Sequence, residues 1–164
     1  MTPPMGRTTV VLGGILLVTM MGCGVFRPSV EEIRTELAHL IDPALDAGLA
    51  GADRPEANVS GGYCHEPLIG PADGIRPLLS YTFSFSILDD PEAFLDRVED
   101  YWRGQGLEVE INANEESRIL YSGNDGYSIS AGITYDSMEV RIGGTGPCVD
   151  NPDRKGPLDV KPSP

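Results

Sequence analysis

The strongest constraint on the fold is an alternation of apolar and polar side chains over residues 78–88, LLSYTFSFSIL. Successive side chains of a β-strand point to opposite faces of the sheet, so this alternation predicts a strand with one apolar and one polar face. The apolar face must be buried against a second layer. The polar face, made of serine and threonine, predicts a solvated sheet surface, with a hydroxyl-rich binding surface as the alternative. The apolar side chains are Leu79, Tyr81, Phe83, Phe85 and Ile87.

A helix with one broad apolar face is predicted directly after this strand, in the sequence DDPEAFLDRVEDYWRGQG at 89–106. Asp90 is the expected N-cap, and Pro91 takes the first helical position, where its missing N–H is harmless. Gly104 provides a C-terminal stop. The spacing predicts that this helix packs on the sheet through Trp102 and its neighbours; stacking of the tryptophan on a ligand is the alternative. The apolar face consists of Phe94, Leu95, Val98, Tyr101 and Trp102.

Another helix is predicted at the N-terminal end of the domain, over residues 29–45. Ser29 and Glu32 form a capping box, and apolar residues follow at helical spacing. Asp42 and Pro43 are expected to end or restart this helix, because the residue before a proline avoids the helical region of backbone space.

Shorter alternating segments predict four further strands, which gives a mostly antiparallel sheet of about five. One well-packed helix on such a sheet, with the N-terminal helix as a second, predicts a two-layer α+β domain over residues 29–148. Residues 46–62 are rich in Gly, Ala, Asp and Pro and predict a loop, and 149–164 predict a disordered tail. The further strands are expected at 107–111, 117–121, 127–135 and 138–142.

Residues 1–22 predict an export signal. Arg7 and the amino terminus precede an almost entirely apolar run from Thr8 to Met21. This order, charge first and apolar run second, is typical of a secretory signal peptide. The run is shorter than the ~20 residues that a membrane-spanning helix needs, which disfavours the alternative of a plain transmembrane anchor.

The sequence MMGC, which ends at Cys23, resembles a bacterial lipobox. Lipoprotein processing attaches a diacylglyceryl group to the cysteine of that motif and cleaves the chain just before it. The match predicts lipid attachment at Cys23, a short tether over 23–28, and a location on the extracytoplasmic face of the cell membrane. The membrane is then reached through the lipid, since two acyl chains suffice for stable anchoring. An ordinary secreted protein with a spare thiol is the alternative.

The three cysteines, an odd number, leave one thiol to explain in an exported protein. If Cys23 carries lipid, Cys64 and Cys148 are free to form a disulfide in an oxidising compartment. Such a bridge would close a long loop that contains nearly all of the predicted strands. Metal binding is the alternative, but neither cysteine has the nearby second cysteine of a zinc half-site. No metal site and no cofactor are therefore predicted.

The chain is strongly acidic, with a formal net charge of −13. An acidic protein repels phosphate backbones and anionic headgroups, so nucleic acid is not an expected partner. Several carboxylates gather around the helix predicted at 89–106, without the spacing of a calcium loop. Helix capping and a solvated helix face account for most of them: Asp89, Asp90, Glu92, Asp96, Glu99 and Asp100.

Candidate catalytic side chains are few. The two histidines are His39 and His65, and the second lies beside Cys64 in the run YCHEP. Adjacent residues of an extended strand point to opposite faces, which argues against a thiol–imidazole pair. Phosphate-binding, dinucleotide-binding and HExxH metal motifs are absent from the sequence. We expect a non-enzymatic domain that binds an envelope protein or a small ligand; the alternative is an envelope hydrolase or metal-dependent enzyme with a site around His65.

The run AFLDRVEDYWRGQGLEVE at 93–110, followed by NDGYSISAGI and GTGPCV, resembles a group of small actinobacterial lipoproteins. Members share a lipobox signal, an early cysteine, a Phe-Leu…Val-Glu…Trp helix that leads to a glycine, and a terminal Pro-Cys. The similarity covers roughly residues 60–150. It implies export, a lipid anchor and a bridge between Cys64 and Cys148, and it implies no catalytic residue.

Overall fold

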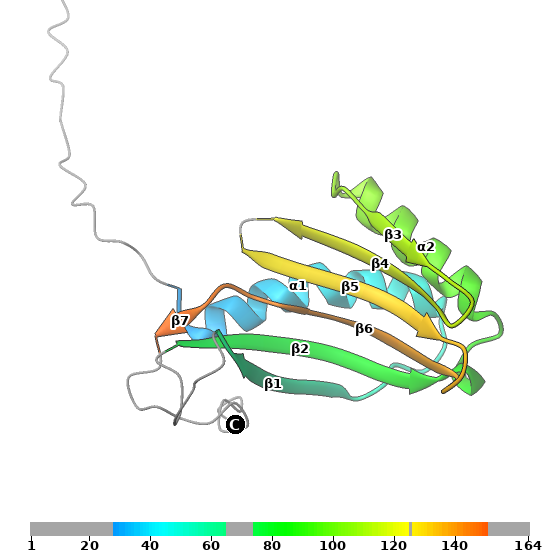
Figure 1. Ribbon diagram of the computed structural model, residues 1–164, viewed down its shortest axis with the longest axis horizontal. Helices are drawn as coiled ribbons and strands as arrows, with labels where there is room; N and C mark the ends of the chain where they lie inside the picture. The colour runs from blue at the N-terminus through cyan, green and yellow to red at the C-terminus, as the bar shows by residue number, and fades with distance from the viewer. Residues whose placement is uncertain (1–27, 65–73, 125, 151–164) are drawn as a thin grey trace, which may run out of the picture.

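The structure is a computed structural model that describes residues 28–64, 74–124 and 126–150 (Figure 1). Within these ranges the chain forms the two helices and the mostly antiparallel sheet of an α+β domain, as predicted. Neither α-helix there has the length and hydropathy that crossing a membrane requires. In chain order the elements are α1 (Val30–Leu49), β1 (Ala57–Tyr63), β2 (Gly74–Ser84), the 3-10 helix η1 (Phe85–Ile87), α2 (Pro91–Gly104), β3 (Glu110–Ala113), β4 (Ser117–Asn124), β5 (Tyr127–Thr134), β6 (Glu139–Thr145) and β7 (Val149–Asp150).

The strands form one sheet whose described pairs are all antiparallel. Their order is β1-β2-β6-β5-β4-β3, and β7 pairs with the start of β2. α2 therefore carries the chain from β2 to the far edge of the sheet, and the chain returns through neighbouring strands to β6 (Figure 1). Within the described residues the sheet has seven strands rather than the expected five. The two extra strands, β1 and β7, lie in ranges predicted as a loop and as a tail, and residues 151–164 lie outside the described residues.

The strand β1 forms from a sequence with few strand-forming side chains, ANVSGGY. Residues 57–63 align one by one with residues 75–81 of β2. Strand formation depends on cross-strand neighbours more than on intrinsic preference. The composition of this segment therefore did not predict a strand, because β1 forms through its hydrogen bonds to β2.

The helix α1 continues past the position where the sequence predicted its end. Ser29 caps it as predicted: its hydroxyl accepts from the N–H of Glu32, whose carboxylate accepts from the N–H of Ser29. Pro43 removes one helical hydrogen bond, but the apolar side chains beyond it are buried against the rest of the core. The helix closes with Ala50 in the left-handed conformation, at φ 51°. The buried side chains after the proline are Ala44, Leu45 and Leu49.

The strand predicted at 78–88 is β2, with both of its ends shifted. It begins at Gly74 and stops at Ser84, and the last apolar residues of the alternation lie in η1. The hydroxyl of Ser84 accepts a hydrogen bond from the N–H of Ser86 at 3.3 Å. Serine side chains that bond to a nearby backbone group favour turns over strands, which accounts for the early end.

The two helices cross at Gly48 of α1. A Cβ at this position would lie 2.5 Å from the Cε2 atom of Phe94 and 2.9 Å from the Cγ2 atom of Val98, so a glycine is required. The Nη2 atom of Arg97 donates to the Gly48 carbonyl oxygen at 2.6 Å. The C-terminal part of α1 thus meets the N-terminal part of α2, and the helices run antiparallel.

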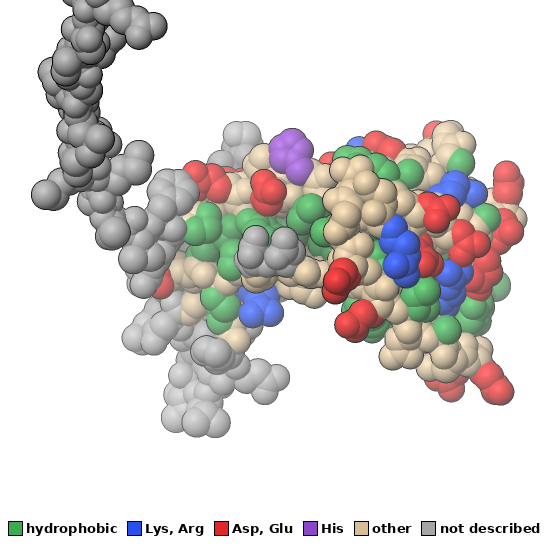
Figure 2. Space-filling view, turned by 90° about the horizontal axis from the view of Figure 1, so that it is seen from above, with side chains coloured by type: hydrophobic (Ala, Val, Ile, Leu, Met, Phe, Trp, Pro, Cys, Tyr) green, Lys and Arg blue, Asp and Glu red, His purple; other side chains and the backbone are tan. Residues whose placement is uncertain are grey.

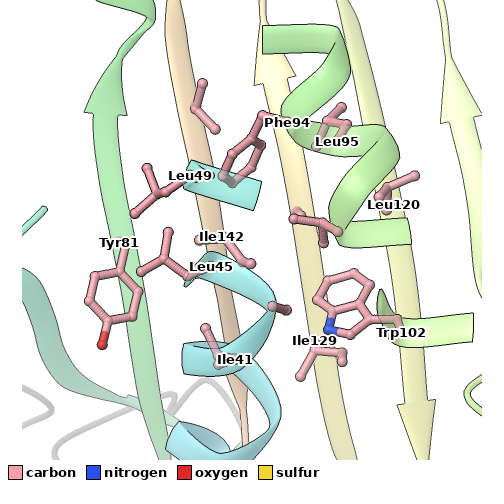
Figure 3. Close-up of a cluster of buried hydrophobic side chains, with 14 of the residues drawn as sticks. Ile41, Leu45, Leu49, Tyr81, Phe94, Leu95, Trp102, Leu120, Ile129 and Ile142 are labelled. Atoms are coloured by element: carbon pink, nitrogen blue, oxygen red, sulfur yellow. The ribbon is translucent and has the colours of Figure 1, made fainter. Parts of the chain in front are cut away.

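Both helices cover the same face of the sheet, and the core fills the space between them (Figure 3). Trp102 is fully buried there, as its place on the apolar face of the predicted helix indicated. Its Nε1 atom donates to the carbonyl oxygen of Leu40 at 3.4 Å, which links α2 to α1. Burial of apolar surface, at about 25 cal/mol per Å², is the main favourable term in such a fold. The largest fully buried side chains are Ile33, Leu37, Ile41, Leu45, Phe94, Leu95, Val98, Trp102, Leu120, Ile133, Val140 and Ile142.

Cys64 and Cys148 are joined by a disulfide, the pair predicted from the sequence. Their Cα atoms lie 5.9 Å apart, and their positions in the sequence differ by 84. Cys64 follows β1 and Cys148 precedes β7. The bridge therefore links the two strands that pair along the start of β2.

Candidate functional site

A groove with mainly apolar walls runs between α1, the C-terminal end of α2 and the β4–β5 hairpin. It consists of two adjoining hollows of about 160 Å³ and 200 Å³, both of which include Leu40 and Leu107 in their walls. Figure 2 looks onto this side of the molecule and shows exposed apolar side chains in a recess, beside a region of mixed acidic and basic side chains. We call it the apolar groove; the other residues that line it are Glu36, His39, Tyr101, Trp102, Gln105, Ser122, Gly123, Tyr127 and Ile129.

The groove exists because the two helices differ in length. α1 has 20 residues and α2 has 14, or about 30 Å and 21 Å at 1.5 Å per residue. The helices are antiparallel, so the N-terminal half of α1 extends beyond the end of α2. Past Gly104 the chain turns away through Gly106, at φ 80°. α2 therefore does not cover the end of β4 and the start of β5. The inner face of the hairpin then forms the floor of the groove.

The floor of the groove carries one buried hydroxyl without a partner. Ser122 is 9% exposed, and its Oγ atom makes no hydrogen bond within the described part of the chain. A buried polar group left unpaired costs about 1–3 kcal/mol, so a ligand that reaches this atom would gain that amount. Ser122 is thus the polar group best placed to orient a molecule in the groove.

The rim of the groove is acidic and has one further acceptor. Burial raises the pKa of Tyr127, and the charge of Glu36 raises this pKa further. Pro43 has no N–H to donate to the carbonyl of His39, so that carbonyl lacks its helical partner. The arrangement therefore favours a neutral or cationic ligand with an apolar body and a hydrogen-bonding group.

A second polar cluster lies where α2 packs on β4, around Arg118. Its guanidinium contacts Glu92 at 2.9 Å, Asp96 at 2.8 Å and Glu99 at 3.3 Å. The hydrogen bond that Arg118 donates to Glu92 raises the pKa of Arg118. The hydroxyl of Tyr135 donates to the same carboxylate, and this bond raises the pKa of Tyr135. Arg118, its three carboxylates and Tyr135 satisfy one another, so this cluster fixes α2 on the sheet and offers no open site.

The structure brings together few of the residues that the sequence singled out. Cys23 and His65 lie outside the described residues, and His39 is an exposed residue at the rim of the groove. Trp102 packs in the core and contributes one wall of the groove. In the part of the chain that the structure describes, no three His, Cys, Asp or Glu side chains are grouped so that they could hold a metal ion.

Sequence reasoning missed Ser122 and Tyr127 as site residues. The sequence predicts a strand that ends at residue 121, whereas β4 continues to Asn124 and so includes Ser122. Tyr127 starts β5, as predicted. A signal was present, since extending the alternation of SRILY by one residue puts Ser122 on the same face as Leu120. The overhang of α1, by contrast, depends on how the helices cross.

Comparisons with known proteins identify no family for this chain. No protein-family model matches it, and no curated protein matches it. Among solved structures, it is similar to the crystal structure of the "putative lipoprotein LppA from Mycobacterium tuberculosis", with a TM-score of 0.42 and 16% sequence identity over 83% of this chain and 87% of that one. A similarity this distant assigns neither a family nor a function.

Proposed function

We propose that this protein is a lipid-anchored extracytoplasmic domain that binds a small apolar ligand in the apolar groove and catalyses no reaction. The observation that carries the binding role is the Oγ atom of Ser122, which has no partner among the described residues and lies in the floor of a mainly apolar groove. Ligand sites are typically concave and apolar, with a small number of polar groups that fix orientation. The groove has this composition.

The chemistry of the walls defines the class of ligand. Leu40, Leu107 and Ile129 offer an apolar surface, and Ser122 offers a hydroxyl that donates or accepts. Glu36 at the rim disfavours an anionic ligand in this groove. A neutral molecule with a flat or extended apolar body and one N–H or O–H group fits these walls.

The proposed location rests on the N-terminal sequence and the cysteines. The signal over 1–22, the lipobox at Cys23 and the disulfide between the remaining two cysteines support export and lipidation. Intact mass spectrometry tests this part. The chain purified from membranes should begin at Cys23 and carry a diacylglyceryl mass, and a Cys23→Ser variant should lack it. An unacylated chain with the same start would contradict the lipid anchor, and it would not bear on the proposal that the groove binds a ligand.

The ligand role can be tested with the single tryptophan of the chain, which lines the groove. N-phenyl-1-naphthylamine is a suitable probe, because it is neutral, has an apolar body and donates one N–H. It should quench Trp102 fluorescence in the lipid-free Cys23→Ser chain with saturable binding. Ser122→Ala should weaken that binding about 5-fold, the equivalent of about 1 kcal/mol for one hydrogen bond.

A matched control for this test is Ile111→Ala. Ile111 is 48% exposed on β3 and does not line the groove, so its loss should leave probe binding unchanged. Quenching that does not saturate, or equal affinities for the Ser122→Ala and wild-type chains, would reject the groove as a ligand site.

A further inference from the structure

The face of the sheet opposite the helices carries a row of mostly small and polar residues. The register of the strands places Asn58, Ser80, Gly143, Ser130 and Tyr121 side by side on five neighbouring strands. Strands lie about 4.8 Å apart, so this row extends for about 19 Å. In the view of Figure 1 this face lies in front, with α1 behind the sheet. Neither helix covers it.

The middle of this row is hollow. A cavity of about 190 Å³ opens there, between side chains of β2, β5 and β6. Gly143 is one of its lining residues. A Cβ at this position would lie 2.7 Å from the carbonyl oxygen of Leu79 and 2.7 Å from the Cβ atom of Ser80, so β6 can approach β2 here only with a glycine. We call this cavity the serine hollow, and its polar walls are Ser80, Ser128, Ser130, Arg141 and Thr145.

Ser80 gives the serine hollow an unsatisfied group. This residue is only 5% exposed, and its Oγ atom finds no hydrogen-bond partner among the described residues. Folding therefore leaves a buried hydroxyl without the bonds it had in water, which is unfavourable. A ligand with a hydroxyl or an acceptor oxygen would satisfy it.

Arg141 gives the serine hollow a positive charge. Its side chain is exposed, and it forms no ion pair or hydrogen bond with any residue that the structure describes. The other described arginines each have a partner, for example Arg54 with Asp42 and Arg103 with Glu99. A free guanidinium on so acidic a chain is complementary to a carboxylate, which it can bind through two parallel hydrogen bonds.

We propose that the serine hollow binds an oligosaccharide that carries a carboxylate. The carboxylate would accept from Arg141, and sugar hydroxyls would exchange hydrogen bonds with Ser80 and its neighbouring hydroxyls. Tyr121 is 40% exposed at the end of the same row, where its ring can pack on the apolar face of a second sugar unit. This site lies on the opposite side of the sheet from the apolar groove and does not depend on it.

The test is calorimetric titration of the full chain in detergent with three sugars. Tetragalacturonate should bind, whereas cellotetraose, a neutral chain of equal length, should bind at least 10-fold more weakly. Galacturonate monomer should also bind at least 10-fold more weakly, since it reaches Arg141 but not the rest of the row. No binding of tetragalacturonate would overturn the proposal, as would equal affinity for the monomer, which would indicate a site for a lone carboxylate.

Variants separate binding from folding. Arg141→Gln should remove the preference for tetragalacturonate over cellotetraose, and Ser80→Ala should weaken binding 5-fold or more. Ser80→Ala should at the same time leave the melting temperature unchanged or raise it, because it removes a buried unpaired hydroxyl. Thr134→Ala changes an exposed hydroxyl at the far end of β5 and should bind as the wild type does. Wild-type affinity in both Arg141→Gln and Ser80→Ala would contradict the proposal.

Discussion

The hydroxyl of Tyr81 donates a 2.7 Å hydrogen bond to the carboxylate of Asp42, and so ties β2 to α1. Arg54 completes the contact, 2.8 Å from Asp42 and 3.2 Å from the Tyr81 hydroxyl. Figure 3 shows the Tyr81 ring at the border of the core, with its hydroxyl directed away from the other labelled side chains. The contact lies one residue before Pro43 and helps to hold α1 on the sheet where its own hydrogen bonding is interrupted.

This contact predicts a loss of stability at high pH. Burial, followed by the hydrogen bond to Asp42, raises the pKa of Tyr81 from 10.0 to about 12. A raised pKa in the folded state means that the contribution is complete below pH 10 and is lost as the pH rises toward 12. Urea denaturation should give wild type a higher free energy of unfolding than Tyr81→Phe at pH 8. This difference should shrink as the pH rises from 10 toward 12. A difference that stays constant would show that Tyr81 titrates alike in the folded and unfolded chains.

Packing against the sheet predicts opposite outcomes for two residues that face each other across strands. Leu120 and Ile111 are paired in register, but Leu120 is fully buried under α2 whereas Ile111 is 48% exposed. Leu120→Ala should lower the free energy of unfolding by about 2–5 kcal/mol, because it leaves a cavity in the core. Ile111→Ala is the control and should cost less than about 1 kcal/mol. Chemical denaturation measures both, and similar losses would contradict the packing described.

The Arg118 cluster predicts a salt-dependent loss of stability. Arg118→Gln leaves the three carboxylates that it joins close together, and should cost about 1–2 kcal/mol, between the values for exposed and buried ion pairs. Added salt should restore part of this loss by screening the repulsion. Arg103→Gln is the control, because Arg103 is 50% exposed and contacts one carboxylate, that of Glu99. Denaturation at low and high NaCl concentration measures the effect, and a deficit that salt does not change would argue against charge repulsion as its cause.

The disulfide predicts a large effect of reduction. The Cys64→Ser, Cys148→Ser double variant should lose about 2–5 kcal/mol, because a long loop of the unfolded chain is no longer closed. A reducing agent should lower the melting temperature of the wild type and leave that of the double variant unchanged. Scanning calorimetry with and without the agent distinguishes the two. A wild-type chain that does not respond would show that the bridge contributes nothing to stability.

Periodicity and cysteine parity predicted much of the architecture. The alternation at 78–88 identified most of β2, and the apolar face at 89–106 identified α2 together with the burial of Trp102. Both signals are local, because a period of 2 or 3.6 residues can be read within one segment. The pairing of Cys64 with Cys148 followed from setting one cysteine aside for lipid.

Features that depend on tertiary contacts could not be predicted from the sequence. β1 exists because β2 offers an edge, and α1 passes Pro43 because the residues beyond it are buried. The apolar groove arises because α1 extends past the end of α2. No sequence pattern encodes how far one helix extends past the other. Ser80 appeared in the sequence as one of several strand serines, and only the register with Gly143 places it at the floor of a hollow.

The covalent loop closed by Cys64 and Cys148 leaves α1 outside it, since that helix ends at Leu49. A pull on the N-terminal end of the domain would therefore act first on a helix that side-chain packing and a few hydrogen bonds hold in place, without a covalent link. The strands within the disulfide-closed loop would withstand this pull for longer. Detachment of α1 would remove one wall of the apolar groove and leave the serine hollow intact, so mechanical load would open the first proposed binding site and spare the second.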